Sequence, residues 1–349
     1  MSNLPLKSLR VLSLVLSLLL GLQAGAGDLA ADTQFMLADR PNADGPATEI
    51  TIGMVVLDID NIDDASQRYR ADLFALVEWQ DKRLALPEEQ RSGRTRTVSM
   101  DDIWTPRALI INDRGLTMQL PDFADIDDLG NVFYKQRFTG ELAADLRYEE
   151  FPADTQLLPI DIVSYEYSPN ELRFSSSSEI RADPDLFSAE GWQFKVLDPE
   201  LGEFRIKGID ASRPRLRFLI EAERNTRYYM WTMFLPMSLI VFMSWTAFWL
   251  QPSIVPARIG ISTASIFSLM ALGFSIRTSL PKIPYMTRAD IFVVGCTLMV
   301  FLALAVAVIG SRWASSEHEH RALRLNAVAR WVYAGMFGVV IAFAFAAAD

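Results

Sequence analysis

The stretch PARIGISTASIF, residues 256 to 267, lies in the most hydrophobic third of the chain and is nevertheless rich in hydroxyl groups, with Ser262, Thr263 and Ser265 close together. Polar side chains are costly where a helix faces lipid, so such a helix turns its polar or small-residue face toward other helices or toward water. The stretch therefore predicts a membrane helix that either packs inside a bundle through its small residues or, in several copies around an axis, forms the wall of a channel.

This helix is one of four apolar stretches that follow Tyr228, at about residues 228–250, 257–280, 289–311 and 329–348. Each has about 20 residues, the length that an α-helix needs to cross about 30 Å of hydrocarbon. The loop between the third and fourth stretches is basic and carries Arg312, Arg321, Arg324 and Arg330. If the chain before Tyr228 is outside, this loop is inside, which agrees with the tendency of basic loops to stay in the cytoplasm, although Arg277, Lys282 and Arg288 on the outer side make the bias slight.

The charge of the chain is divided between two parts. Residues 27–223 carry 39 acidic and 21 basic residues, a net charge of −18, whereas residues 224–349 carry 4 acidic and 10 basic residues, a net charge of +6. The first 26 residues place Lys7 and Arg10 before an apolar run and then small residues, which is the order of a secretory signal peptide. We expect residues 1–26 to be a signal peptide, with an uncleaved anchor as the alternative, residues 27–223 to be an exported domain and residues 224–349 to be a membrane domain.

The exported part has the composition of an all-β protein. Runs of β-branched and aromatic residues alternate with turn formers, and RLRFLIEAE, residues 215–223, alternates polar with apolar side chains. We predict a β-sandwich, with a loop or turn at the acidic FADIDDLG, residues 123–130. The single cysteine, Cys296, falls in an apolar stretch outside the exported domain. The exported domain therefore has no disulfide, and its hydrophobic core alone must stabilise it.

Five motifs resemble those of a known family. In chain order they are WQDKRL at 79–84, IWTP at 103–106, FPAD at 151–154, RNTRYY at 224–229 and SLPKIPYMT at 279–287. With them the chain resembles the pentameric ligand-gated ion channels, the superfamily of the Cys-loop receptors, in the prokaryotic form that lacks the two cysteines of the signature loop. The resemblance implies an immunoglobulin-like sandwich, a four-helix membrane bundle and a homopentamer around a central pore.

The resemblance also implies which residues form the pore. The lining positions on the second membrane helix are Gly260, Ala264, Phe267, Ala271, Phe274 and Thr278. Rings of phenylalanine lose water readily, so we expect Phe267 to be the main hydrophobic gate and Phe274 a second constriction. The residues expected to select ions at the two mouths are Pro256, Ala257, Arg258 and Arg277. Two positive rings favour anions, although the net charge of −18 on the domain above attracts cations.

By the same resemblance, the ligand binds between neighbouring sandwiches in an aromatic cage. The matching residues are Phe74, Arg107, Tyr165 and Glu166. Aromatic faces attract cations, so the expected ligand is an amine. Arg107 stands where the family has an aspartate, and Tyr165 stands where it has a tryptophan, so the ligand need not resemble a neurotransmitter.

Coupling between the exported domain and the pore is expected at the tip of the signature loop. The residues implied are Phe151, Pro152, Asp154, Arg224, Pro281, Lys282 and Tyr285. A carboxylate at a loop tip can form a charge-assisted pair with an arginine just above the membrane. We therefore expect Asp154→Asn to impair gating rather than assembly.

These expectations describe a ligand-gated, anion-conducting channel, a multi-pass protein of the bacterial plasma (inner) membrane with its N-terminal domain in the periplasm or outside the cell. Its partners are other copies in a homopentamer, membrane lipid, permeant ions and an unidentified small-molecule agonist. We expect no cofactor, no metal and no nucleic acid.

Two other functions stay open. One is a cation-selective or non-selective channel gated by protons or divalent cations, for which carboxylates are supplied by Asp58, Asp60, Asp63, Asp64, Asp122, Asp125, Asp127 and Asp128. The other is a membrane-tethered sensor that conducts no ions. An enzyme is not expected, because the sequence has neither a nucleophile-and-base arrangement nor a metal motif.

Overall fold

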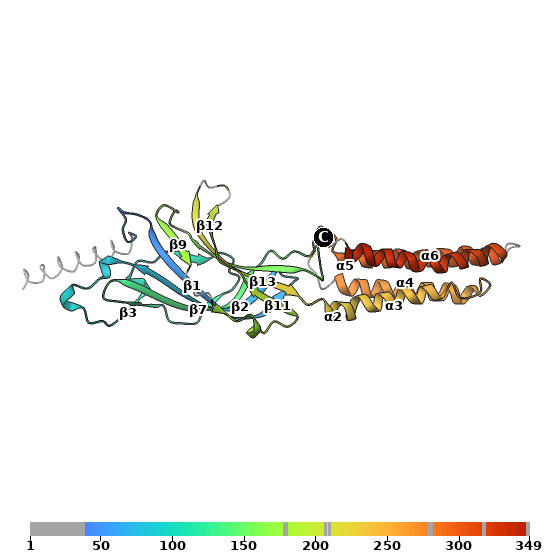
Figure 1. The fold of residues 1–349 in the computed structure, drawn as a ribbon, viewed down its shortest axis with the longest axis horizontal. Helices are drawn as coiled ribbons and strands as arrows, with labels where there is room; N and C mark the ends of the chain where they lie inside the picture. Colours follow the sequence, from blue (N-terminus) through green and yellow to red (C-terminus); the bar gives the residue numbers. More distant parts are fainter. Residues whose placement is uncertain are drawn as a thin grey trace, which may run out of the picture.

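The computed structural model describes residues 39–176, 181–205, 208, 211–277, 282–315 and 319–346. The molecule is elongated, with a β-rich domain at one end and a bundle of helices at the other (Figure 1). The chain passes between them after strand β13 (Ser212–Arg224) and before helix α2 (Arg227–Tyr229). The predicted signal peptide, residues 1–26, lies outside the described residues.

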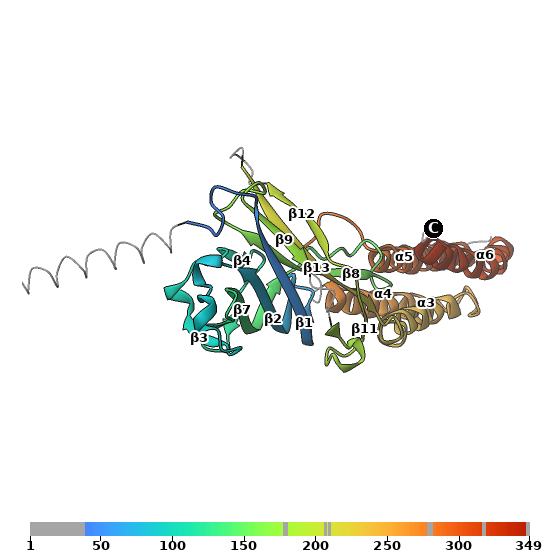
Figure 2. The same cartoon turned by 60° about the vertical axis from the view of Figure 1, so that its left-hand side comes forward.

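The β-rich domain consists of two sheets. The first contains β1 (Thr48–Asp63), β2 (Arg68–Gln80), β3 (Arg96–Ser99), β5 (Thr117–Met118), β6 (Phe123–Ile126), β7 (Asn131–Ala143), β9 (Leu172–Ser176) and β10 (Arg181–Ala182), in the order β10-β1-β2-β7-β6-β3 with β5 on β7 and β9 on β1. The second contains β4 (Ala108–Ile110), β8 (Thr155–Ser164), β11 (Trp192–Val196), β12 (Glu200–Arg205) and β13, in the order β11-β13-β8-β4 with β12 on β13. Figure 2 shows the sheets from a second direction. The predicted all-β sandwich is confirmed.

The core lies between the sheets because successive side chains of a strand point alternately into the sandwich and out of it. Along β2 the odd-numbered residues from Tyr69 to Ala75 are buried, and the residues between them are more exposed. At the end of this strand the ring of Trp79 meets the ring of Trp104 edge to face, with centroids 6.2 Å apart. Trp104 in turn donates a hydrogen bond from Nε1 to Tyr167 Oη at 2.7 Å. The tryptophans of two of the family-like motifs are therefore core residues.

The acidic stretch 123–130 differs from the prediction of a loop. Its first half is strand β6, in which Ala124 and Ile126 point inward and are each 1% exposed. The turn begins at Asp127, whose carboxylate accepts hydrogen bonds from the backbone N–H groups of Leu129 and Asn131, both at 2.8 Å. The loop prediction is wrong for residues 123–126. It was based on the acidic residues, whereas the apolar residues between them alternate as in a strand with one buried face.

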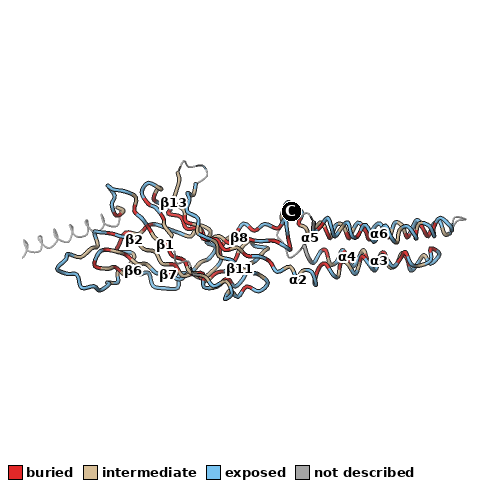
Figure 3. The backbone as a smooth tube through the Cα atoms, viewed as in Figure 1, coloured by how far each residue is buried: buried red, intermediate tan, exposed pale blue. Residues whose placement is uncertain are grey.

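Within the described part of the chain, four helical spans are long and apolar enough to cross a membrane. The first is Arg227–Thr246, which joins α2, a π-helical turn (Met230–Phe234) and α3 (Leu235–Thr246). The others are α4 (Val255–Arg277), α5 (Arg288–Ala314) and α6 (Glu319–Ala346). In Figure 3 exposed and buried residues alternate along these helices, as expected for spans that pack on one side and face lipid or other subunits on the other.

Helix α6 begins about ten residues earlier than predicted. We expected a linker up to residue 328, whereas α5 continues to Ala314 and α6 begins at Glu319. Residues 319–328 are rich in alanine, leucine and arginine, which form helices readily even where the segment is too polar to count as an apolar stretch. Arg321 and Arg324 therefore lie on a helix and not in a loop.

Candidate functional site

The sandwich and the helices meet at a junction of four segments. These are the turn between β1 and β2, the loop between β7 and β8, the end of β13, and residues 282–287 before α5. The first three supply ionised groups that come together, namely Asp64 from the turn, Asp154 from the loop and Arg224 from the last position of β13.

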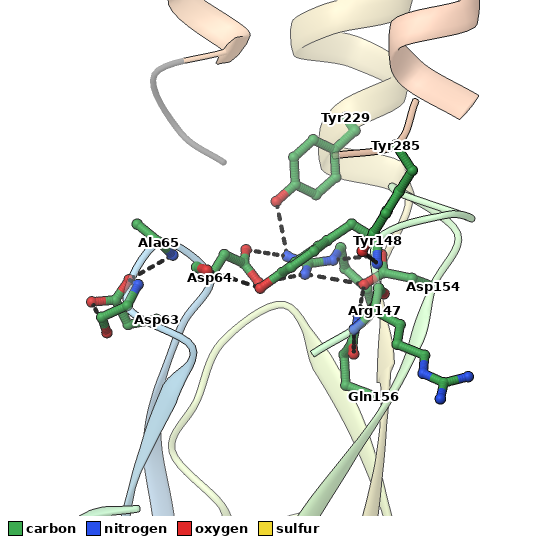
Figure 4. A network of polar contacts seen from close by, with 11 residues as sticks. Asp63, Asp64, Ala65, Arg147, Tyr148, Asp154, Gln156, Tyr229 and Tyr285 are labelled. Carbon is green, nitrogen blue, oxygen red and sulfur yellow. Dashed lines mark hydrogen bonds and ion pairs between the residues drawn. The ribbon is translucent and has the colours of Figure 1, made fainter. Parts of the chain in front are cut away.

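Arg224 lies at the centre of the junction and bridges two carboxylates. It donates to Asp154 from Nε to Oδ1 at 2.8 Å and from Nη2 to Oδ2 at 3.2 Å. It donates to Asp64 from Nη1 to Oδ2 at 2.8 Å and from Nη2 to Oδ1 at 2.7 Å. Nη1 also donates to Tyr229 Oη at 3.2 Å. Figure 4 shows Asp64, Asp154 and Tyr229 converging on this network, so one guanidinium connects two loops of the sandwich to α2.

The network is almost dry. The Arg224 and Asp154 side chains are 4% and 2% exposed, and the guanidinium carbon lies 4.2 Å from the ring centroid of Trp192. Burial by itself lowers the pKa of Arg224, but the hydrogen bonds to Asp64 and Asp154 outweigh it and raise the pKa above its ordinary value. Arg224 therefore stays charged, and its pairing in a desolvated place is strong and sensitive to loss of a partner.

The loop between β7 and β8 is also bonded to the segment that leads into α5. The backbone N–H of Arg288 donates to the carbonyl of Glu149 at 3.1 Å, and the Arg288 side chain pairs with Glu150 at 2.7 Å. The backbone N–H of Tyr148 donates to Tyr285 Oη at 3.1 Å. Movement of this loop would therefore pull on the start of α5.

The junction contains most of the coupling residues that the sequence predicted. Those that the structure describes are Phe151, Pro152, Asp154, Arg224, Lys282 and Tyr285. Lys282 is exposed, and Pro281 lies outside the described residues. Trp192 was not among the predicted residues, and Asp64 was predicted as one of a group of acidic residues. No sequence signal pairs Asp64 with Arg224, because 160 positions separate them.

Helix α4 has two different sides. The residues predicted to line a pore form one exposed stripe, consisting of Gly260, Ala264, Phe267, Ala271 and Phe274. Their spacing of three and four residues places them on one face, where Phe267 and Phe274 are 69% and 72% exposed. Ser262 and Ser265 are 0% exposed, so these hydroxyl groups face the bundle of their own subunit. Thr278 and the side chain of Arg277 lie outside the described residues.

Arg258 also faces the bundle, which contradicts the prediction that its side chain rings the inner mouth. It is 0% exposed, donates from Nε to the carbonyl of Ala247 at 3.0 Å and donates from Nη2 to Asn326 Oδ1 at 2.7 Å. It precedes Ser262 by one helical turn, so the helix places it on the buried side. Among the described residues its Nη1 has no hydrogen-bond partner and no carboxylate pairs with it. Of the residues predicted to select ions at this end, Pro256 and Ala257 are exposed.

Three of the predicted ligand-binding residues lie together. The backbone N–H of Tyr165 donates to the carbonyl of Arg107 at 3.0 Å, and Arg107 Nε lies 3.5 Å from Glu166 Oε2. Phe74 lies elsewhere, half-buried on the face of β2 opposite to its inward-facing neighbour Ala75. Within one chain the four residues therefore do not form a single cage.

Several of the acidic residues named as carboxylates for divalent cations are engaged by other groups of the protein, as Asp64 is by Arg224. Asp63 accepts a hydrogen bond from Ser66, and this bond is the main cause of the lowered pKa of Asp63. Asp128 Oδ2 accepts from the backbone N–H groups of Ser92 and Gly93 at 2.7 and 2.6 Å. In the part of the chain that the structure describes, no three His, Cys, Asp or Glu side chains are grouped as metal ligands.

Two family models match this sequence. Residues 28–213 match the neurotransmitter-gated ion-channel ligand binding domain, and residues 233–333 match the neurotransmitter-gated ion-channel transmembrane region. The first match covers most of the sandwich, and the second runs from the π-helical turn into α6.

Proposed function

Because the chain belongs to the neurotransmitter-gated ion-channel family, we propose that it forms a homopentameric channel whose pore is lined by α4 and opened by a small molecule bound between neighbouring sandwiches. The sandwich is extracellular, the chain crosses the membrane several times, and pentamers are the norm of the family. We place the protein in the inner membrane of a bacterium, with residues 1–26 as the signal that exports the sandwich.

The observation that carries this proposal is the exposed stripe on α4. The helix buries Ser262 and Ser265 in its own bundle and exposes Phe267 and Phe274. In a ring of five copies this stripe faces the axis. Ala271 leaves a wider section between the constrictions at Phe267 and Phe274, and Gly260 and Ala264 leave another on the inner side of Phe267. Such apolar constrictions close a pore by excluding water, without a plug.

We propose that the pore selects anions. Helix α4 carries no acidic residue, and Arg258 buries a positive charge near its inner end without a carboxylate partner among the described residues. A buried charge acts through a medium of low dielectric constant and is screened less by salt than an exposed one. Five buried guanidinium groups around the axis therefore favour chloride at the inner mouth, although they do not touch it.

The proposed agonist is an amine held by Tyr165 and Glu166 of one subunit and Phe74 of the next. Tyr165 is 51% exposed and stands beside the Glu166 carboxylate, and both an aromatic face and a carboxylate attract an ammonium group. Phe74 occupies a different face of the same chain, as a site shared between subunits requires. Arg107 pairs with Glu166 at 3.5 Å, so an amine would have to displace this pair.

Reconstitution of the purified protein in planar bilayers tests these proposals. Across a tenfold gradient of KCl, agonist-evoked currents are expected to reverse close to the chloride equilibrium potential. Candidate amines, steps in pH and calcium are added in turn to evoke the current. Reversal close to the potassium equilibrium potential would mean that the acidic sandwich dominates selectivity, and currents evoked by protons or calcium alone would favour the alternative gating. Pentamers that stay silent under every condition would favour the sensor.

Arg258→Gln is expected to move the reversal potential from the chloride value toward zero, because it removes the buried charge and keeps a polar side chain for Ala247 and Asn326. Arg324→Gln is the matched control, since it removes an exposed charge from α6 at the same end of the bundle. Equal shifts in both variants would assign selectivity to surface charge and would contradict a specific role of Arg258.

A further inference from the structure

A cavity of about 780 Å³ lies between the two sheets of the sandwich. This volume falls within the range of small-molecule sites, about 300 to 1,000 Å³. Its walls come from both sheets and are mainly apolar, including Ile52, Met54, Ala75, Val77, Ile103 and Ile162. The interior of the cavity therefore suits an apolar body and not a small ion.

Trp79 forms part of the wall and carries a donor without an acceptor. The residue is 4% exposed, and its Nε1–H has no hydrogen-bond partner among the described residues. The neighbouring Trp104 differs, because its Nε1–H is bonded to Tyr167. Buried N–H groups are nearly always paired in proteins. An acceptor carried by an occupant of the cavity would supply the partner that Trp79 lacks.

The rim of the cavity is acidic and aromatic. Asp101 and Asp122 line it and are exposed, whereas Arg107 on the same rim is already paired with Glu166. Tyr134 also lines the cavity, and burial of its ring, with a smaller contribution from Asp122, raises the pKa of Tyr134 to about 12. The phenol therefore stays neutral at physiological pH, and the rim as a whole attracts a cation.

We propose that this inter-sheet cavity is a ligand site contained within one subunit, and that its occupant is a small amphipathic amine. The ammonium group lies at the rim against Asp101 and Asp122, the apolar body fills the space between the sheets, and an acceptor such as an ether oxygen binds Trp79 Nε1–H. The cavity shares Arg107 and Tyr165 with the site proposed between subunits. The two sites differ in their other wall, because Val77 lines the cavity and Phe74 points to the opposite face of β2. It concerns binding alone and does not depend on whether the chain conducts ions.

Isothermal titration calorimetry of the full-length protein with 4-methoxyphenethylamine tests this site. The Phe74→Ala protein is used throughout, so that the cage between subunits lacks the aromatic face that the neighbouring subunit supplies, while the wall of the cavity stays intact. We expect saturable binding that Val77→Phe weakens by about tenfold or more, because the new ring occupies the cavity. The milder Ala75→Val variant is expected to act in the same direction, which keeps the test decisive if Val77→Phe does not assemble.

Two further variants test the chemistry of the occupant. Asp122→Asn is expected to weaken binding of the amine by about threefold and to leave the neutral 2-(4-methoxyphenyl)ethanol unaffected, since a partly screened charge contributes modestly. Trp79→Phe removes the donor and keeps the ring, so the methoxy compound should lose its advantage over 4-ethylphenethylamine. Absence of saturable binding in the Phe74→Ala protein, or binding that both cavity-filling variants leave unchanged, would overturn the inference.

Discussion

Asp154→Asn is expected to abolish the agonist-evoked current while pentamers still assemble. The substitution removes the charge that accepts two hydrogen bonds from Arg224, at 2.8 and 3.2 Å. Loss of one partner of a buried pair costs about 3–5 kcal/mol when the other charge is left alone. Here Asp64 still neutralises Arg224, so the cost is smaller and the fold survives. What is lost is the ion pair between the loop before β8 and the strand that continues into the first membrane helix, while the backbone hydrogen bond from Arg224 N–H to the Asp154 carbonyl, at 3.1 Å, remains.

The measurement compares currents in bilayers with the size of the purified protein in detergent. Asp161→Asn is the matched control, because Asp161 and Arg217 form a similar pair, with N–O distances of 2.6 and 2.9 Å, in the middle of the second sheet and away from the junction. We expect this control to lower thermal stability and to keep the current. Normal currents from Asp154→Asn, or an equal loss in both variants, would contradict the role of the junction in gating.

Phe267→Ala is expected to produce a current in the absence of agonist. Phe267 is 69% exposed in the subunit, and in the proposed pentamer five of its rings narrow the pore. Alanine removes the rings, widens the constriction and lets water remain, so the closed state conducts. The expected result is a leak comparable to the agonist-evoked current of the unmodified channel, with a smaller leak for Phe274→Ala.

Phe343→Ala is the control for this prediction. Phe343 is also an exposed phenylalanine, at 67%, but it lies on α6 and not on the proposed pore helix. Its replacement should leave the resting current near zero. A silent Phe267→Ala channel that still opens with agonist would move the gate elsewhere on α4, and a leak from Phe343→Ala would show that loss of packing alone opens the pore.

The parts of the fold that were predictable from the sequence are those that depend on pattern and length. Alternation in residues 215–223 predicted strand β13, and runs of about 20 apolar residues predicted the membrane spans. The family resemblance is also confirmed, because residues 28–213 and 233–333 match the two models of the neurotransmitter-gated ion-channel family. The helical structure of residues 319–328 was not predicted. Hydropathy alone assigns this segment to a linker, but its residues form helices readily and α6 extends through it.

The chemistry of the candidate site was less predictable, because it depends on where side chains point in three dimensions. Arg258 was assigned to the inner mouth of the pore by the family resemblance, yet the helical period places it on the same side as Ser262 and against Asn326 of a distant helix. The partnership of Asp64 with Arg224 arises from the packing of two sheets, which a pattern in one segment does not encode. The Trp79 N–H, which has no partner among the described residues, likewise results from packing around the cavity that no sequence pattern encodes.

Arg224 binds Asp64, next to the first sheet, and Asp154, next to the second, and it also contacts Tyr229 of the first membrane span. A planar guanidinium cannot keep good geometry with both carboxylates if the sheets slide relative to each other. A shift that starts in either sheet therefore changes the same set of bonds above the membrane. The displacements of the two sheets are therefore summed at this one side chain. A ligand between the sheets and a ligand between subunits would reinforce each other if they displace Asp64 and Asp154 in the same direction. The two ligands would cancel each other if they displace these residues in opposite directions.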